Sequence, residues 1–273
     1  MRVTAEPVRI AILGADGRMG RALTRAVLAA APNAMLGAAC ERAGHPAVGK
    51  DAGVLAGGEP LGVIITGELP SPGAAEVWID FTVASATEMV ASSAVQASAA
   101  LVVGTTGLGT HARAALDVAA IRTAVVYAAN YSVGINVMLE LVADAARALG
   151  ADYDLEIVEA HHRAKNDAPS GTALRLAEAL ADATGRNLAA SARYARHGDL
   201  GPRTPSEIGI QAVRGGDVVG DHTVYFLGNG DRIEITHRAS TRDTFAVGAV
   251  RAALWAAGRA PGLYDMRNVL GLV

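Results

Sequence analysis

The stretch VRIAILGADGRMG, residues 8–20, decides the fold of this chain of 273 residues. Its first six residues, Val8–Leu13, form an apolar run of the length of a buried strand, and a helical pattern follows the turn. Gly14, Gly17 and Gly20 stand between the two. A strand, a glycine turn and a helix in this order are typical of dinucleotide-binding units, because the glycines permit a tight turn, backbone approach to a pyrophosphate and close helix packing.

The spacing Gly-x-x-Gly-x-x-Gly departs from the commoner Gly-x-Gly-x-x-Gly, so the neighbouring elements have to support this assignment. Strands are expected at Met35–Cys40, Leu61–Thr66, Val77–Phe81, Leu101–Gly104 and Ala124–Tyr127, and helices at Ser85–Gln96 and Thr110–Ala120. Such alternation predicts βαβ units, hence a parallel sheet with helices on both faces. Residues 1–132 are therefore expected to form an α/β domain, Rossmann-like, that binds a dinucleotide.

The pattern changes after a helix expected over residues 134–149. Strands are expected at Tyr153–His161, Ile208–Val213, Gly220–Leu227 and Arg232–Ala239, with a hairpin turn at 228–231, one helix that ends at Gly185 and a final helix at Asp243–Ala257. Residues 133–242 are therefore expected to form a smaller α+β domain with a mostly antiparallel open sheet. The sheet face without a helix needs a partner, since apolar residues alternate along the last two strands. Candidates for that face are Val224, Phe226, Ile233 and Ile235.

An acidic and a basic residue follow the second strand. Glu41 stands at the usual interval after the glycine turn, where an acid hydrogen-bonds ribose hydroxyls, and Arg42 can meet a 2′-phosphate. The pair predicts use of both NADH and NADPH, whereas a solvated loop is the alternative. Residues 104–107 and 129–132 end later strands, where ligands bind in such sheets, although 104–107 also fits an ordinary strand-to-helix turn. Residues 80–82 have a similar position or cap the next helix.

The run EAHHRAKNDAPSGTA, residues 159–173, carries the chemistry. Cationic and titratable side chains precede a polar turn and an apolar helix, with Pro169 expected near the first turn of that helix. Unpaired N–H groups and the macrodipole at a helix N-terminus attract anions, so Ser170, Gly171 and Thr172 are expected to bind a carboxylate. The layout suits a carboxylate-bearing substrate that must also receive a proton.

The paired histidines also fit two simpler arrangements. Neighbouring residues of a strand point to opposite faces, so His161 and His162 could be a core residue and a surface residue. A zinc site is the weaker alternative, because no cysteine pair or His-Glu-x-x-His spacing accompanies them, and no metal is expected.

Composition narrows the class of protein. Hydrophobic residues make up 51% of the chain, and 24 Lys and Arg against 27 Asp and Glu give a net charge of −3, which argues against a nucleic-acid or anionic-membrane partner. Cys40 is the single cysteine, so no intrachain disulfide can form. The N-terminus has no secretory pattern, and the uncharged stretch 89–110 is too rich in Ser, Thr and Gly for a membrane span. A cytoplasmic location is expected.

With these pieces assembled, nearly the whole chain resembles the dihydrodipicolinate reductase (4-hydroxy-tetrahydrodipicolinate reductase) family of bacterial lysine and diaminopimelate biosynthesis. The motifs that carry the resemblance are GADGRMG (14–20), GTTG (104–107), AANYSVGIN (128–136), EAHHRAKNDAPSGTA (159–173), EITHRAS (234–240) and GLYDM (262–266). The chain departs from the family at Ala84, where a proline usually follows Asp-Phe-Thr, and this affects only the local turn.

The resemblance implies reduction of the cyclic dicarboxylate 4-hydroxy-tetrahydrodipicolinate to tetrahydrodipicolinate by NADH or NADPH, with loss of water. It implies proton transfer by His161 and Lys165, and substrate contacts at His162, Gly171 and Thr172, next to Ser170. Cofactor contacts are implied for Gly14, Ala15, Asp16, Gly17, Arg18, Met19, Glu41, Arg42, Gly104, Thr105, Thr106, Ala128, Ala129, Asn130 and Tyr131. It also implies a homotetramer built through the second domain, and a final segment, 243–273, that completes the first domain.

Two rival functions remain. A related two-domain dehydrogenase of an open-chain amino or hydroxy acid would share the first domain, but it would not need the His-His-x-x-Lys segment. A non-catalytic NAD(P)-sensing protein could keep the fold, but it has no reason to keep proton donors and an anion turn together.

Overall fold

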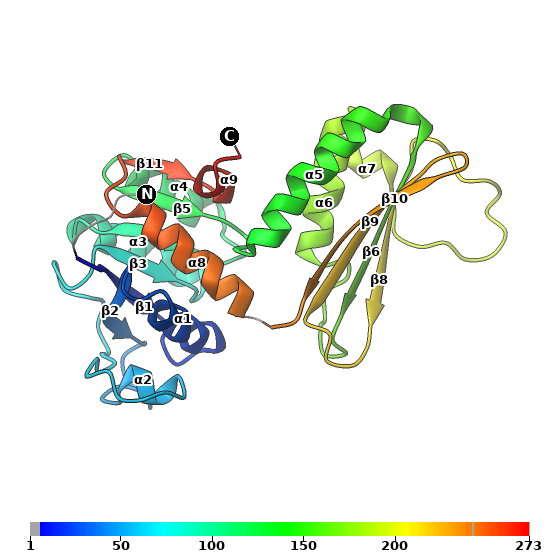
Figure 1. The fold of residues 1–273 in the computed structure, drawn as a ribbon. Helices are drawn as coiled ribbons and strands as arrows, with labels where there is room; N and C mark the ends of the chain where they lie inside the picture. The colour runs from blue at the N-terminus through cyan, green and yellow to red at the C-terminus, as the bar shows by residue number, and fades with distance from the viewer. Residues whose placement is uncertain (1–5, 242, 273) are drawn as a thin grey trace. The chain divides into compact units, whose positions relative to one another are not determined.

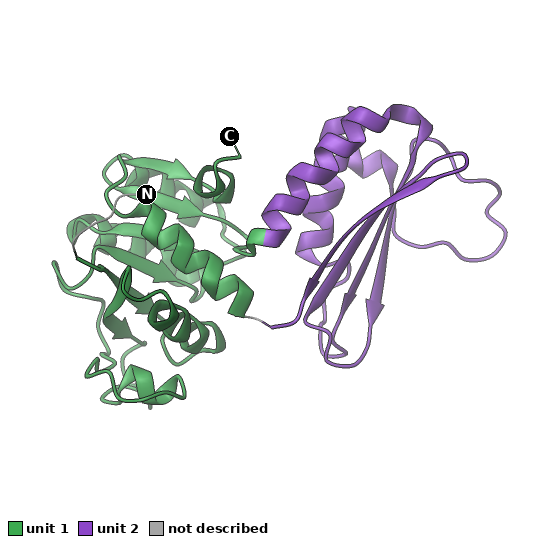
Figure 2. Cartoon of the chain, in the orientation of Figure 1, with its two compact units in different colours: residues 1–133, 242–273 green, residues 134–241 purple. Residues whose placement is uncertain are grey.

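The computed structural model describes residues 6–241 and 243–272, so the predicted domain limits at 1, 242 and 273 lie outside the described residues. The chain divides into two compact units (Figures 1 and 2). Unit 1 takes its residues from 1–133 and 242–273, and unit 2 from 134–241. Within the described residues, no helix combines the length and the apolar character that a membrane crossing requires.

Unit 1 is built on a six-stranded parallel sheet with the strand order β11-β5-β4-β3-β1-β2. Its strands are β1 (Val8–Leu13), β2 (Ala34–Cys40), β3 (Val77–Asp80), β4 (Ala100–Val103), β5 (Ala124–Tyr127) and β11 (Gly262–Tyr264). The strand β1 has β2 on one side and β3 on the other. After β2, successive strands are therefore added on the opposite side of β1, so the strand order reverses at this point. In open α/β sheets, ligands bind outside the carboxyl ends of the strands at such a switch point. The predicted Rossmann-like sheet is confirmed.

Helices cover both faces of this sheet, as predicted (Figure 1). They are α1 (Arg18–Ala29), α3 (Thr87–Gln96), α4 (Thr110–Ala120) and α8 (Asp243–Ala256), with the short α2 (Ala52–Leu55), η1 (Ala84–Ala86) and α9 (Met266–Leu270). Successive residues of β3 show the two layers. Ile79 belongs to the core cluster that contains residues of α1 and α8, whereas Trp78 packs with residues of α3 and α4.

The strand predicted at Leu61–Thr66 is wrong, because the segment makes only isolated bridges. Its backbone groups have another partner. The Asp51 carboxylate accepts hydrogen bonds from the N–H groups of Gly53, Val54, Leu61 and Gly62, which ties the segment into a loop around one side chain. An apolar run alone does not distinguish such a loop from a strand.

Unit 2 contains a five-stranded sheet with the order β10-β9-β6-β8-β7. Its elements are α5 (Val133–Leu149, which begins in unit 1), η2 (Gly150–Asp152), β6 (Asp154–His161), α6 (Gly171–Thr184), α7 (Leu188–Ser191), β7 (Ala192–Arg193), β8 (Ile208–Arg214), β9 (Gly220–Leu227) and β10 (Arg232–Ala239). The β10–β9 and β9–β6 pairs are antiparallel, as predicted, but β6–β8 and β8–β7 are parallel, so the open sheet is mixed. Gly185 ends α6 in the left-handed conformation, also as predicted.

The helices α5 and α6 pack on one face of this sheet, and this corrects the residues assigned to the uncovered face. Val224 and Phe226 are fully buried against the helices, and their partners on β10, Ile235 and Ile233, lie on the same side. Alternation identifies residues that share a face but does not say which face the helices cover. The uncovered face carries the other set of β9 residues, of which Tyr225 is half-buried.

Candidate active site

The glycine turn of unit 1 is folded for close backbone contact. Gly14 has a φ of +72°, a conformation that favours glycine. A Cβ on Gly20 would lie 2.2 Å from the carbonyl oxygen of Gly14, so the start of α1 sits directly against the end of β1. Gly17 caps α1 without a side-chain hydrogen bond. The backbone therefore fits a pyrophosphate at the helix N-terminus, where the dipole favours an anion.

Glu41 and Arg42 follow β2 beside this turn. One carboxylate oxygen of Glu41 accepts a hydrogen bond of 3.0 Å from the Asp16 N–H, and the Asp16 side chain pairs with Arg21 at 2.6 Å. Glu41 is half-buried, whereas Arg42 and Arg18 are exposed. The structure thus brings the predicted acid to the glycine turn and leaves both guanidinium groups accessible.

The other predicted cofactor residues lie at the carboxyl ends of β4 and β5, but their side chains differ in role. The Thr105 hydroxyl accepts the Thr82 N–H at 3.0 Å, and the Tyr131 hydroxyl donates to the carbonyls of Val103 and Val126. These side chains are buried and hold strand ends together. Gly104 leaves room for the ring of Phe81, since a Cβ there would lie 2.2 Å from it. The remaining predicted residues sort by accessibility: Ala15 and Ala128 are buried, Gly14, Met19 and Asn130 are half-buried, and Thr106 and Ala129 are exposed.

Asp80 ends β3 with a fully buried carboxyl group. One of its oxygens accepts hydrogen bonds from the backbone and hydroxyl of Thr82, at 2.9 and 2.6 Å, so the segment forms a local turn. Burial raises the pKa of Asp80 despite these bonds. Burial also raises the pKa of the neighbouring thiol, Cys40, to about 12, which makes it an inert core residue.

In unit 2 the most connected side chain is Glu159, which is fully buried near the end of β6. Its carboxylate accepts two hydrogen bonds from Arg214 at 2.7 and 2.8 Å, one from the His161 ring at 2.6 Å and one from the Ser170 N–H at 3.0 Å. Burial acts to raise the pKa of Glu159, but the bonds from Arg214, His161 and Ser170 outweigh it, and the pKa lies below its ordinary value.

His161 follows Glu159 by two residues and lies on the same face of β6. Its ring packs edge-on against His222 of β9, with centroids 5.2 Å apart. Burial, followed by the charge of His161, lowers the pKa of His222 to about 4, so His222 is neutral at physiological pH. The Nε2 atom of His222 lies 3.1 Å from the Ser170 hydroxyl. His161 is therefore neither a core residue nor a surface residue but part of a polar cluster.

Lys165 and His162 belong to the loop that joins β6 to α6. The Lys165 N–H donates to the His162 carbonyl at 3.1 Å, which turns the loop back on itself. The Lys165 ammonium pairs with both oxygens of Asp167 at 2.8 Å, and this contact lowers the pKa of Asp167. Lys165 keeps 20% of its side chain exposed, so a ligand can reach it.

Ser170 is the N-cap of α6, and its hydroxyl accepts the Ala173 N–H at 3.2 Å. Pro169 therefore stands directly before the cap, near the first turn of α6 as predicted. Gly171 is the first helical residue and is exposed, and an added Cβ would meet no atom within 4 Å. Thr172 follows it in the first turn. The structure thus brings the predicted anion turn beside Glu159 and His222.

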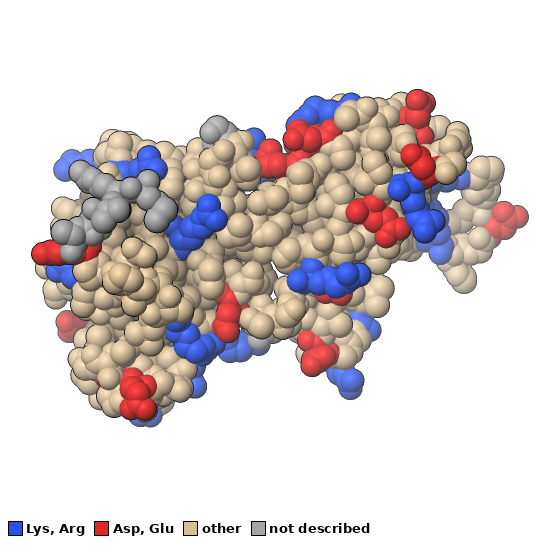
Figure 3. Space-filling view, in the orientation of Figure 1, with Lys and Arg blue, Asp and Glu red and all other residues tan. Residues whose placement is uncertain are grey.

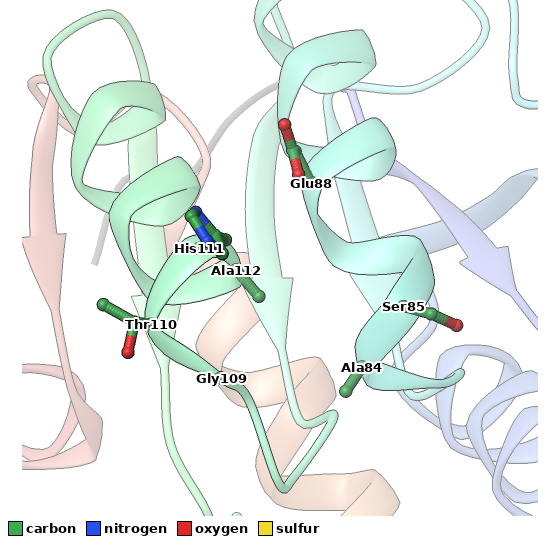
Figure 4. Close-up of a pocket in the computed structure, with 7 residues that line it drawn as sticks. All are labelled: Ala84, Ser85, Glu88, Gly109, Thr110, His111 and Ala112. Carbon is green, nitrogen blue, oxygen red and sulfur yellow. The ribbon is translucent and has the colours of Figure 1, made fainter.

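Three members of this cluster were not predicted from the sequence. Glu159 stood inside the quoted run, whereas Arg214 and His222 lie 55 and 52 positions from their partners Glu159 and Ser170. Ionisable residues within or directly after the predicted strands are the signal that could have pointed to them, because such groups are rarely buried without partners. A separate hollow in unit 1 was also not predicted; Figure 4 shows Ser85 and Glu88 on one side of it and Thr110 and His111 on the other.

The Rossmann-like parallel sheet, with its glycine turn, and the second unit, with titratable side chains beside a helix N-terminus, are typical of one class of protein: two-domain, nicotinamide-dependent oxidoreductases. The family models described as dihydrodipicolinate reductase, N-terminus and C-terminus, match residues 8–131 and 134–270. The chain belongs to the dihydrodipicolinate reductase family.

Individual relatives agree with this family. The chain is 54% identical over 266 residues to the 4-hydroxy-tetrahydrodipicolinate reductase of Anaeromyxobacter dehalogenans strain 2CP-C, covering 97% of this chain and 98% of that one. It is 53% identical to the enzyme of the same name from Halorhodospira halophila, covering 96% and 98%. The fold matches the dipicolinate-bound dihydrodipicolinate reductase from Paenisporosarcina sp. TG-14 with a TM-score of 0.74 at 22% identity, over 95% of this chain and 97% of that one. The prediction of an NAD(P)H-dependent oxidoreductase is confirmed.

Proposed function

We propose that this chain reduces 4-hydroxy-tetrahydrodipicolinate to tetrahydrodipicolinate with NADH or NADPH, in bacterial lysine and diaminopimelate biosynthesis. The observation that carries the proposal is the cluster in unit 2, where His161 and the Ser170 N–H share the Glu159 carboxylate and Lys165 lies in the loop between them, paired with Asp167. A cyclic dicarboxylate that must be protonated needs both kinds of group. In this assignment unit 1 is the dinucleotide-binding domain and unit 2 is the substrate-binding and oligomerisation domain.

The bound nicotinamide would supply the hydride. The glycine turn would hold its pyrophosphate, and Glu41 would accept hydrogen bonds from the ribose hydroxyls. His161 and Lys165 would deliver the proton, and His162 with Ser170, Gly171 and Thr172 would hold the substrate carboxylates. Steady-state turnover with the cyclic substrate, followed at the nicotinamide absorbance band, tests the proposal. An open-chain dehydrogenase or an NAD(P) sensor would leave that absorbance unchanged with this substrate.

Cofactor choice is expected to depend on Arg42. Its exposed guanidinium can form charge-assisted hydrogen bonds with the 2′-phosphate that only NADPH carries. Replacing Arg42 by alanine should therefore weaken NADPH binding by about 10-fold or more, the scale of one charged hydrogen bond, and leave NADH binding nearly unchanged. Dissociation constants for both cofactors, measured by fluorescence quenching, check this. Equal changes for the two would show that Arg42 does not face the 2′-phosphate.

We also propose a homotetramer that forms through the uncovered face of the unit 2 sheet. Val213 is 52% exposed on that sheet, at the end of β8, and the helices pack on the other face. Light scattering at micromolar concentration should give the mass of four chains of 27.8 kDa each. A charge at this position, in Val213→Asp, should lower the mass. A wild-type protein that scatters as a monomer would refute the assembly.

The partners proposed are small molecules, and the location proposed is the cytoplasm. On the face shown in Figure 3, basic and acidic side chains are interspersed, without the broad field of positive charge that nucleic acids attract. This agrees with the net charge of −3.

A further inference from the structure

We infer that Glu159 is a positioning residue for the proton transfer. Its carboxylate holds the ring of His161 and the start of α6 at the same time, and thereby sets the geometry between the proton donor and the turn that binds the substrate carboxylate. The inference rests on the proposed function, because it assigns Glu159 a role through His161.

The hydrogen bonds of Glu159 fix the orientation of its carboxylate. One oxygen accepts the Ser170 N–H at 3.0 Å and one guanidinium N–H of Arg214 at 2.7 Å, while the other accepts from His161 at 2.6 Å and from Arg214 at 2.8 Å. An ionised carboxylate offers about four acceptor sites, so this group is saturated. Arg214 donates a further bond of 2.7 Å to the Asp167 carbonyl. The carboxylate and its guanidinium partner thus tie together the ends of β6 and β8, the loop before α6, and the start of α6 itself.

The contact to His161 fixes which ring nitrogen exchanges a proton. The Nδ1 atom faces the carboxylate, which can only accept, so Nδ1 carries a proton in the neutral ring and in the imidazolium. Proton exchange with a ligand is left to Nε2. An orienting carboxylate behind a catalytic imidazole is a general device that sets both the tautomer and the ring orientation.

Gly220 supplies an independent observation at the other nitrogen. A Cβ on this first residue of β9 would lie 3.0 Å from the Nε2 atom of His161 and 3.7 Å from the ring of His222. The backbone at Gly220 has no positive φ, so backbone conformation does not demand glycine there. The missing side chain instead keeps the space beside Nε2 clear.

The first test is Glu159→Gln, which keeps the size of the side chain but replaces one acceptor oxygen by a donor. The amide oxygen can still accept from Ser170 and from one N–H of Arg214. The amide N–H₂ takes the place of the oxygen that accepts from His161 and from the other Arg214 N–H, so that second Arg214 bond is lost, and the amide favours a His161 ring protonated on Nε2. We expect kcat to fall by about 10²–10³-fold, the scale of losing an oriented acid or base, with the Kd for NADH unchanged. The nitrogen-15 signals of His161, assigned through His161→Gln, should move toward the Nε2–H tautomer.

Glu156→Gln is the matched control. Glu156 lies three residues earlier on β6, on the opposite face, and also binds arginines, with two bonds from Arg196 at 2.7 and 2.9 Å. Loss of this pair should leave kcat and the His161 signals unchanged. The inference is overturned if the His161 signals stay the same in Glu159→Gln, or if Glu156→Gln lowers kcat equally. Should the wild type fail to turn over the substrate, the proposed function falls, while the nitrogen-15 spectra still decide whether Glu159 sets the tautomer.

A second variant, Gly220→Ala, leaves the buried carboxylate of Glu159 intact. It therefore tests the role of His161 Nε2 even if Glu159→Gln does not fold. The added methyl group meets Nε2, so kcat should fall by up to about 10²-fold, the lower end of the contribution of general acid–base catalysis. The Kd for NADH and the melting temperature should stay the same. An unchanged kcat would show that Nε2 is not the exchanging nitrogen and would overturn that part of the inference.

Discussion

Replacing Lys165 by alanine is expected to lower kcat by about 10²–10⁴-fold, the range for loss of a positioned acid. The Lys165 ammonium forms two hydrogen bonds of 2.8 Å with the Asp167 carboxylate, and 20% of the Lys165 side chain is exposed to solvent. The ammonium is therefore both positioned and accessible to a ligand. An ammonium that already carries a proton and a charge can both bind a substrate carboxylate and serve as donor. The variant should fold normally, since the residue lies in a loop.

Two controls separate the contributions of Lys165. Lys165→Arg keeps the charge but replaces a group that can lose its proton by one that cannot, so KM should recover while kcat stays low. Asp167→Asn removes the partner but not the donor, and kcat should change far less than in Lys165→Ala. Turnover of Lys165→Ala at the wild-type rate, with NADH binding intact, would remove Lys165 from the mechanism.

Planar pyridine-2,6-dicarboxylate, or dipicolinate, is expected to compete with the substrate and not with NADH. It carries two carboxylates on a ring similar to that of the substrate, so it can occupy the same contacts without being reduced. Removing either carboxylate should weaken inhibition by roughly 1.5–3 kcal/mol, the scale of one charged hydrogen-bonding contact. Inhibition kinetics against each substrate in turn provide the measurement.

Substitution of Gly171 tests where that carboxylate binds. A Cβ at this position meets no atom of the described chain within 4 Å, so Gly171→Ala and Gly171→Val should fold with little loss of stability. The added atoms would project into open space at the first turn of α6. Inhibition by dipicolinate should weaken from glycine to alanine and fail with valine, while the Kd for NADH stays constant. Undiminished inhibition of Gly171→Val would reduce the turn to an ordinary helix start.

Much of unit 1 could be predicted from the sequence because its central strands, β3 and β4, are buried along their whole length and its other long strands also consist mostly of apolar residues. The predicted β5 agrees with the observed strand, Ala124–Tyr127, at both ends. β11 has only three residues and exists through its pairing with β5, which no local pattern encodes. The loop at 61–66 was misassigned because its N–H groups bind a distant side chain, Asp51, instead of a neighbouring strand.

The candidate site could be predicted only where its residues are close in sequence. His161, Lys165 and Ser170 share one run, so their types and spacing pointed to proton transfer and anion binding. Arg214 and His222 reach the same cluster through the register of β8 and β9 against β6, which pairs Arg214 with His161 and His222 with Glu159. Register depends on contacts between distant segments, and alternation along one strand does not reveal it.

The way α8 completes unit 1 has a consequence for synthesis on the ribosome. This helix buries residues such as Val250 and Ala253 in the first core, and Gly248 lies so close to Tyr131 that a Cβ would be 1.7 Å from its carbonyl oxygen. The ribosome therefore has to synthesise all of unit 2 before the last layer of unit 1 exists. Until then an apolar face of the unit 1 sheet lacks part of its helical cover and is exposed to aggregation and to chaperones. Synthesis of unit 1 thus begins first, but its folding is completed last.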